Sequence, residues 1–229
     1  MAQVFALGAM LVHLATPAVQ AAPNAHAARP ADPGGSLVAY VAPGHRVALR
    51  VRPHGRSVGV VGSRTAFGSR LALPVVRVRG DWLGVVSGAM PNGRLGWVDA
   101  SQRALVLGRV RLTLETDLSR RVLRVWADGR VVRRIPVGIG RAGSRTPTGR
   151  FSVTDKLRGP EFGSYYGCCI LALSGHQTHL PRGWRGGARL AIHGGSRGAV
   201  SAGCLHAATR DLRYLMRVVP LGAQVVIHL

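Results

Sequence analysis

The sequence predicts a mainly β protein in two parts, a small N-terminal barrel and a larger β domain with one short helix. Three observations predict this. The chain holds 31 Gly and 13 Pro among 229 residues, and this favours many turns and strands. Short apolar segments recur between turn residues, whereas only one stretch has apolar residues at helical spacing. The length allows one or two domains with real cores.

Composition excludes several classes of protein. Hydrophobic residues make up 47% of the chain, too many for a disordered basic tail, and no apolar run reaches the ~20 residues that span a membrane. The 31 Lys and Arg against 9 Asp and Glu leave a net charge of +22, and Lys156 is the one lysine. Such a charge predicts an anionic partner.

The first 27 residues are typical of a secretory signal peptide. Residues 1–27 hold no Lys, Arg, Asp or Glu, and an apolar stretch at 4–15 precedes small-residue sites at 19–21 and 25–27. The usual basic start is missing, so a disordered Ala-rich leader or an upstream start codon is the alternative. We expect an exported protein, with residues 28–37 as a linker.

Residues 38–103 are expected to form the small barrel. Short apolar pieces alternate there with turn residues, and Pro91-Asn92-Gly93 predicts a hairpin turn before the strand at 95–98. This region holds no catalytic constellation. Gly80-Asp81-Trp82-Leu83 and the stretch 92–98 resemble a bacterial SH3-like module.

The second domain is expected at residues 108–229. Asp128-Gly129 predicts a type I′ turn between strands at 122–126 and 131–139, because both residues tolerate positive φ. Residues 143–149 are expected to be a loop. Helical spacing of Leu212, Leu215, Met216 and Val219 predicts one helix that ends before Pro220. Further strands are expected at 110–114, 151–154, 190–192 and 225–227.

One constellation points to chemistry. His193 ends a predicted strand, and Cys204 follows 11 residues later, ahead of the helix. A cysteine becomes nucleophilic as a thiolate, whose pKa falls beside an imidazolium or a helix N-terminus. Gly203 would let a substrate carbonyl approach, with nearby amides as oxyanion donors. A reactive Cys–His pair is favoured over a buried inert cysteine. The ligand spacing of a zinc site is missing, so no metal is expected.

These residues resemble the L,D-transpeptidase catalytic domain of bacterial cell-wall enzymes. The family has His-Gly or His-Ser, then Ser/Thr-His-Gly-Cys, a hydrophobic residue and Arg or Asn. Here His193-Gly194 is followed by residues 201–206, in which Ala202 and His206 depart from the pattern. Further matches are the stretches 112–128, 146–151 and 221–227.

The resemblance implies a β-sandwich domain and a peptidoglycan L,D-transpeptidase. Cys204 would attack the stem-peptide carbonyl before a terminal D-alanine, with His193 taking the proton and the backbone of Gly194 orienting the ring. An amine of a neighbouring stem would then form a 3→3 crosslink. The implied partners are donor and acceptor stem peptides and anionic wall polymers. No nucleic-acid partner and no cofactor are expected. The protein is expected to be a monomer.

Four residues are weaker substrate-binding candidates, each with a structural alternative. Ser201 could bond near the oxyanion site or cap the following turn. His206 replaces a permanent cation with a group that titrates near neutral pH. Tyr166 could stack on a substrate or only pack, and Arg150 could meet anionic groups or be solvated.

Two other functions stay open. A Cys peptidase or carboxypeptidase would use the same Cys–His pair with water as the acceptor. A non-enzymatic binding protein would use the basic surface alone, although no nucleic-acid-binding motif is evident.

Cys168 and Cys169 are adjacent, so they could join each other only through a strained ring, and the simpler expectation is two small, buried strand residues. If either reached Cys204, oxidation would switch the enzyme off.

Overall fold

A computed structural model describes residues 35–229. The expected signal peptide and most of the expected linker lie outside the described residues. Ser36 and Leu37, expected in the linker, belong to the first strand.

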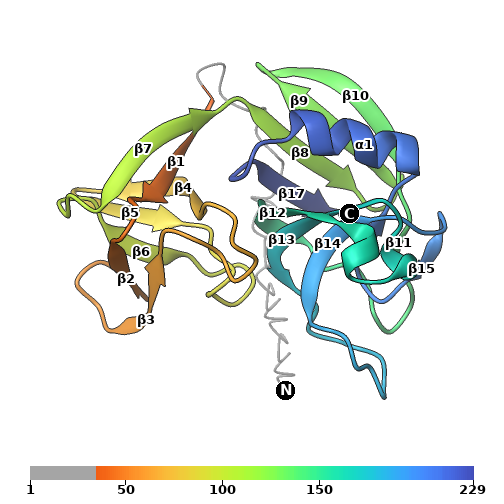
Figure 1. The fold of residues 1–229 in the computed structure, drawn as a ribbon, viewed down its shortest axis with the longest axis horizontal. Helices are drawn as coiled ribbons and strands as arrows, with labels where there is room; N and C mark the ends of the chain where they lie inside the picture. Colours follow the sequence, from red (N-terminus) through yellow and green to blue (C-terminus); the bar gives the residue numbers. More distant parts are fainter. Residues whose placement is uncertain (1–34) are drawn as a thin grey trace, which may run out of the picture.

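Seven strands form an antiparallel sheet on one side of the molecule (Figure 1). They are β1 (Ser36–Val41), β2 (Arg46–Arg50), β3 (Ser57–Gly62), β4 (Ala72–Arg79), β5 (Trp82–Val85), β6 (Gly96–Asp99) and β7 (Leu105–Val110). Their order is β3-β2-β6-β5-β4-β1-β7. This first sheet has its own apolar core, which includes Leu49, Leu73 and Val85.

The predicted turn at residues 91–93 lies in the connection between β5 and β6. The amide of Arg94 donates to the Pro91 carbonyl over 3.0 Å, and Gly93 has φ 75°, which glycine adopts without steric cost. β5 and β6 pair antiparallel on either side. The turn prediction is confirmed.

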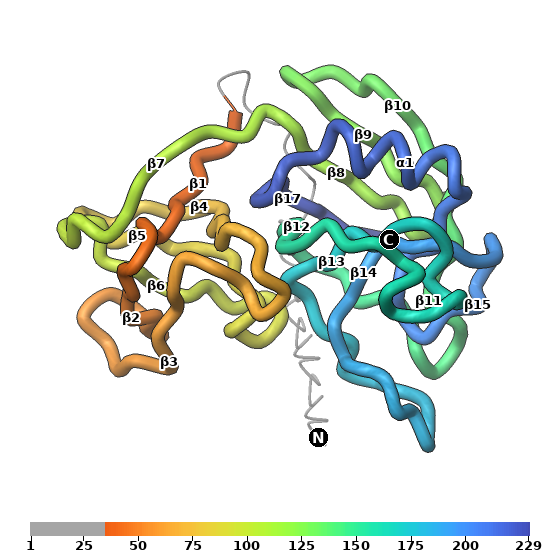
Figure 2. Tube along the Cα trace, viewed as in Figure 1, coloured from red at the N-terminus to blue at the C-terminus, as the bar shows by residue number. Residues whose placement is uncertain are grey.

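β7 connects the two parts of the molecule. It pairs with β1 along its length, and after Arg111 the chain runs directly into β8 (Leu112–Asp117) (Figure 2). The first sheet therefore extends to Val110, past the end of the expected module at 103.

The second sheet has eight strands in the order β10-β9-β8-β17-β12-β13-β14-β16. Besides β8, they are β9 (Val122–Ala127), β10 (Arg130–Pro136), β12 (Gly149–Arg158), β13 (Cys169–His176), β14 (Arg189–His193), β16 (Leu205–His206) and β17 (Gln224–His228). A separate parallel pair joins β11 (Ile139–Gly140) to β15 (Ala199–Ser201). Register shifts in β12 and β13 mark irregularities that bend strands. The mainly β prediction is confirmed.

The β9–β10 hairpin turns as expected. Asp128 has φ 48° and Gly129 has φ 75°, the two positive values that a type I′ turn needs. Two short 3-10 segments, η1 (Gly159–Glu161) and η2 (Ser164–Tyr166), lie between β12 and β13.

The predicted helix is α1 (Thr209–Val218), which packs against the second sheet (Figure 1). It buries Leu212 and Leu215, and its buried Asp211 pairs with Arg133 over 2.7 Å. The helix ends ahead of Pro220, which cannot continue the hydrogen-bond pattern.

The two sheets contact one another directly. The larger core, centred on the second sheet, also contains Val38 and Ala72 from the first. The side chain of Asn92 exchanges two hydrogen bonds with the backbone of His176, of 2.6 and 2.9 Å. No helix within residues 35–229 is long and apolar enough to cross a membrane.

Candidate active site

Cys204 lies at the end of a short, internally bonded loop. The buried Ser201 hydroxyl donates to the Cys204 carbonyl over 2.6 Å and accepts from the Gly203 amide over 3.0 Å. The amide of Arg141 donates to the Ser201 carbonyl over 3.0 Å, tying the loop to the end of β11. The loop that carries the cysteine is therefore held by hydrogen bonds within itself and by one hydrogen bond from Arg141.

His193 ends β14 and lies on the same face as Cys204. In the parallel pair of β14 and β16, Ile192 is opposite Leu205 and His193 is opposite His206. One step back along this register places Cys204 beside Ala191, and alternation turns Cys204, His193 and His206 to one side of the sheet. Cys204, the residue directly before β16, is therefore expected on the same face as His193, diagonally across the β14–β16 pair.

The orientation of the His193 ring is set by backbone contacts. Its Nδ1 lies 2.6 Å from the Gly194 carbonyl oxygen, so Nδ1–H donates there and Nε2 is left to accept a proton. The Gly194 amide in turn donates to the Tyr166 carbonyl over 2.9 Å. A Cβ at Gly194 would lie 2.9 Å from that carbonyl oxygen, so a side chain would not fit without a shift.

Four rings cluster around the site. The centroid of His193 lies 4.7 Å from His206, 4.9 Å from Tyr166 and 5.3 Å from Tyr165. The Tyr165 hydroxyl is 3.5 Å from His206 Nε2, and His206 Nδ1 is 3.1 Å from the Ser196 carbonyl oxygen. Since His193 is 1% exposed and His206 is 3% exposed, both imidazoles are packed rather than solvated.

Burial keeps the catalytic candidates neutral at rest. It lowers the pKa of His193 to about 4, helped by the neighbouring His206, and it raises the pKa of the Cys204 thiol to about 11. A backbone hydrogen bond from Ala191 acts in the opposite direction on Cys204 but is the smaller effect.

The expectation of a lowered thiol pKa is therefore wrong for the resting enzyme. The imidazole is neutral, and β16 separates Cys204 from α1, which begins only at Thr209. The helix terminus is too far along the chain to act directly on the sulfur, since its influence is confined to the first turn.

The structure shows Ser201 in the second of its two expected roles, bonded within the turn that follows it. The Ser201 hydroxyl and the Gly203 amide bond to each other within the loop. Gly203 has φ 121°, and its Cβ position is taken by the side chain of Gln177. The glycine is thus required by the loop conformation and by the position of Gln177.

Arg150 is separated from the cluster. Its guanidinium donates to the Gln224 side chain. Arg150 also lines a cavity with Arg77 and Arg94 from the first-sheet region, and no residue of the ring cluster lines that cavity. His206 and Tyr166, by contrast, lie against His193. Burial lowers the pKa of His206, so it does not replace the cation of the family motif.

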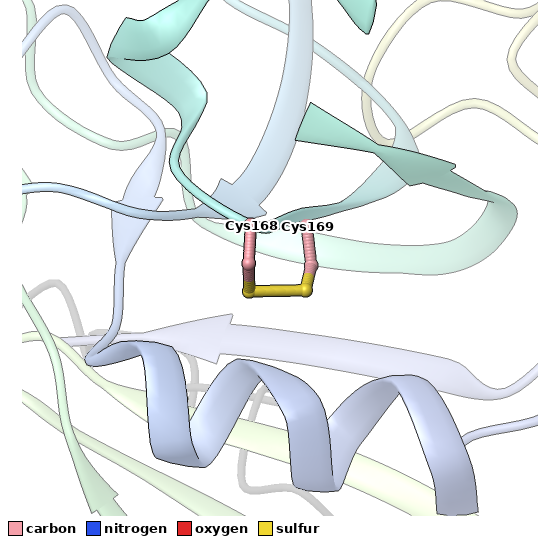
Figure 3. Close-up of a disulfide and its surroundings, with 2 residues drawn as sticks. All are labelled: Cys168 and Cys169. Atoms are coloured by element: carbon pink, nitrogen blue, oxygen red, sulfur yellow. A yellow bond between two sulfur atoms is a disulfide. The ribbon is translucent and has the colours of Figure 1, made fainter. Parts of the chain in front are cut away.

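Cys168 and Cys169 are joined to each other by a disulfide, contrary to the expectation of two unbonded cysteines. Figure 3 shows both sulfurs on the side of the sheet that faces α1. Cys169 packs in the core there, whereas Cys204 is the free cysteine. The pair therefore does not reach Cys204 in this state.

Sequence reasoning missed Gln177, which follows β13. Its amide contacts the Cys204 loop and the wall of a cavity of about 820 Å³. A single glutamine between an apolar strand and a loop carries no motif, and only the three-dimensional packing identifies it. Among residues 35–229, no group of three or more His, Cys, Asp or Glu could hold a metal ion.

Comparisons with known proteins show what this chain is similar to. The family model of the L,D-transpeptidase catalytic domain (YkuD) matches residues 111–227, just over half of the chain. A putative L,D-transpeptidase YkuD of Bacillus licheniformis is 28% identical over 149 residues, covering 61% of this chain and 82% of that protein. The Bacillus subtilis protein of the same name is 28% identical over 120 residues, covering 50% and 65%.

Among solved structures, an L,D-transpeptidase from Mycobacterium smegmatis aligns with a TM-score of 0.40 and 17% identity. The alignment covers 61% of this chain and 76% of that one. On the match of the family model, the chain belongs to the L,D-transpeptidase catalytic-domain family.

Proposed function

We propose that this chain crosslinks peptidoglycan as an L,D-transpeptidase that forms 3→3 crosslinks through a thioester on Cys204. The observation that carries the proposal is the neutral His193 imidazole, held by Gly194 as a diagonal neighbour of the free thiol. This arrangement provides a base and a nucleophile on adjacent strands.

The resting pKa values indicate when the proton moves. With the thiol near 11 and the imidazole near 4, a separate thiolate–imidazolium pair is strongly disfavoured at neutral pH. The proton therefore passes from Sγ to His193 Nε2 as sulfur attacks the carbonyl carbon that precedes the terminal D-alanine. The C–S bond forms, the C–N bond breaks, and the same proton leaves on the D-alanine amine.

The second half-reaction reverses these movements. An amine of a neighbouring stem attacks the thioester, its proton passes to His193, and the thiol of Cys204 is restored as the C–S bond breaks. If water attacks instead, the product is a hydrolysed stem, and the enzyme is a cell-wall carboxypeptidase.

We also propose that the first sheet is an SH3-like module that holds the enzyme on anionic wall polymers. Within residues 36–103 no arginine forms a salt bridge with a carboxylate, so the positive charge of this region is available to a partner. Because peptidoglycan lies outside the cytoplasm, the proposal requires export. We expect the exported enzyme to act as a monomer.

The decisive test uses a defined stem tetrapeptide and mass spectrometry. Wild-type protein is expected to release D-alanine, gain the mass of the acyl group and yield crosslinked dimers. Cys204→Ala should do none of these. Hydrolysed stems without dimers would favour the carboxypeptidase, and equal behaviour of wild type and Cys204→Ala would refute both enzymes.

A further inference from the structure

Gln177 connects three segments of backbone through one buried amide. Its Nε2 donates toward the carbonyls of Ser144, Arg145 and Ala202 at 3.2, 3.0 and 3.0 Å, and its Oε1 accepts from the His179 amide at 2.9 Å. Two N–H groups serve three acceptors, so at least one hydrogen is shared. The side chain is 6% exposed, and all four of its partners are backbone groups.

Gly203 and Gln177 are fitted to one another. A Cβ on Gly203 would lie 2.1 Å from Gln177 Nε2, 3.0 Å from its Cδ and 3.4 Å from its Cγ. These are the three nearest atoms to that position, and all belong to this one side chain. Gln177 is therefore the nearest neighbour of Gly203, the residue before the nucleophile, on that side.

The other side of Gln177 faces the cavity of about 820 Å³. That cavity is also lined by Gly140, Arg145 and Ala199, which belong to or adjoin the β11–β15 pair. Neither Cys204 nor His193 lines it. Gln177 is thus a shared wall between the cavity and the loop that carries the thiol.

We infer that Gln177 is a positioning residue for acylation: it holds the Ala202–Cys204 backbone against the Ser144–Arg145 turn of the cavity wall. An acyl donor must fix its carbonyl relative to the sulfur within a fraction of an ångström, whereas a small alkylating reagent approaches the sulfur from any open direction. Loss of Gln177 therefore slows acylation far more than it slows alkylation. The inference rests on the proposed function for its natural donor.

The experiment is a double-mutant cycle of Gln177→Ala and Gly203→Ala. Acylation is timed by intact mass with the stem tetrapeptide and, separately, with a carbapenem. Alkylation is timed with iodoacetamide, which reports one site because Cys204 is the free thiol. Gln177→Ala is expected to slow both acylations about 10- to 100-fold and to change alkylation by less than about threefold.

The cycle tests the contact itself. Gly203→Ala is expected to slow acylation by a larger factor in the wild-type background than in the Gln177→Ala background, because the side chain that the added methyl group would collide with is then gone. The strain of Ala at φ 121° is common to both backgrounds and cancels. Additive effects, or acylation by Gln177→Ala at the wild-type rate, would overturn the inference.

Two further variants separate positioning from folding. Gln177→Glu keeps the size and loses both N–H donors, so it should behave as Gln177→Ala does. Gln224→Ala removes another buried glutamine with a side-chain bond, to Arg150, and should acylate normally. Equal losses of acylation, alkylation and melting temperature in the Gln177 variants would show a merely structural role. Carbapenem acylation without tetrapeptide acylation would refute the proposed function. The role of Gln177 could still be tested then, from the carbapenem and iodoacetamide rates alone.

Discussion

The chemistry of the site depends on a buried imidazole and a half-buried thiol, both neutral at rest. Burial is the main reason that the pKa of His193 falls and that of Cys204 rises, and both shifts oppose a preformed ion pair. Many reactive cysteines instead lie in electropositive surroundings that favour the thiolate. In this enzyme the base is active over a wide pH range because it stays unprotonated well below neutral pH.

This neutrality predicts the pH profile of acylation. His193 must be unprotonated, so kcat/KM is expected to fall on the acid side near pH 4 rather than near the ordinary value of 6.5. The alkaline limit lies near the thiol pKa of about 11, and the rate should be level between. Carbapenem acylation from pH 3.5 to 9 measures the acid limb and the level region of this profile.

A variant at His206 provides the control. The charge of His206 is the second cause of the low His193 pKa, after burial, so His206→Asn should move the acid limb toward higher pH. An acid limb at 6.5 in wild type, or one that stays in place in His206→Asn, would contradict the account. The bond from His206 Nδ1 to Ser196 makes Asn the appropriate replacement, since it keeps a donor.

At the scale of single residues, the sequence could indicate the reactive pair Cys204 and His193 but not the residue that holds the Cys204 loop. Cys204 and His193 stand in recognisable motifs, and the structure brings them to one face of adjacent strands. Gln177 could not be predicted, because its partners are backbone carbonyls from segments distant in sequence. The packing reason for glycine at 203 could not be predicted for the same cause, since the atoms nearest to its Cβ position belong to Gln177.

Among the elements, those with local signals were predictable and those defined by pairing were not. The Asp128-Gly129 turn and α1 follow from turn chemistry and helical spacing, and both were confirmed. β16 has only two residues, Leu205 and His206, and exists because it pairs with β14. Missing it led to the wrong view that a helix terminus lies directly behind Cys204.

The disulfide between Cys168 and Cys169 at the start of β13 can be tested directly. Because these neighbours pair with each other and Cys204 stays free, the three cysteines of the chain should present one thiol. Thiol titration of denatured, unreduced protein is expected to give one equivalent, and three after reduction. The control is Cys204→Ala, which should give none before reduction. Three thiols without reductant would contradict the pairing.

Across the whole molecule, the two sheets are expected to unfold together. Val38 and Ala72 of the first sheet belong to the larger core, and a Cβ at Gly222 would lie 2.9 Å from Ala72 and 3.0 Å from Val38. Thr65 also donates a hydrogen bond to the buried carboxylate of Asp155. Contacts of this kind couple the stability of one sheet to that of the other.

The contact between Asn92 and His176 allows this coupling to be measured. The Asn92 side chain forms hydrogen bonds with both the N–H and the C=O of His176, the residue before Gln177. Asn92→Ala leaves them unpaired in a half-buried position, so the free energy of unfolding should fall by about 1–3 kcal/mol. Gln102→Ala, in an exposed turn of the first sheet, is the matched control and should change it little.

Two probes follow unfolding in denaturant. With Trp126 and Trp184 replaced by Phe in every protein compared, fluorescence of the buried Trp82 and Trp97 reports the first sheet, and the reaction of Cys204 with a thiol reagent reports the second. Their midpoints should coincide in wild type and move together in Asn92→Ala, because one cooperative unit responds as a whole. Separate midpoints, or a shift of the tryptophan transition alone, would mean that the sheets are independent. If both midpoints shift together, the first sheet stabilises the backbone beside Gln177 through Asn92.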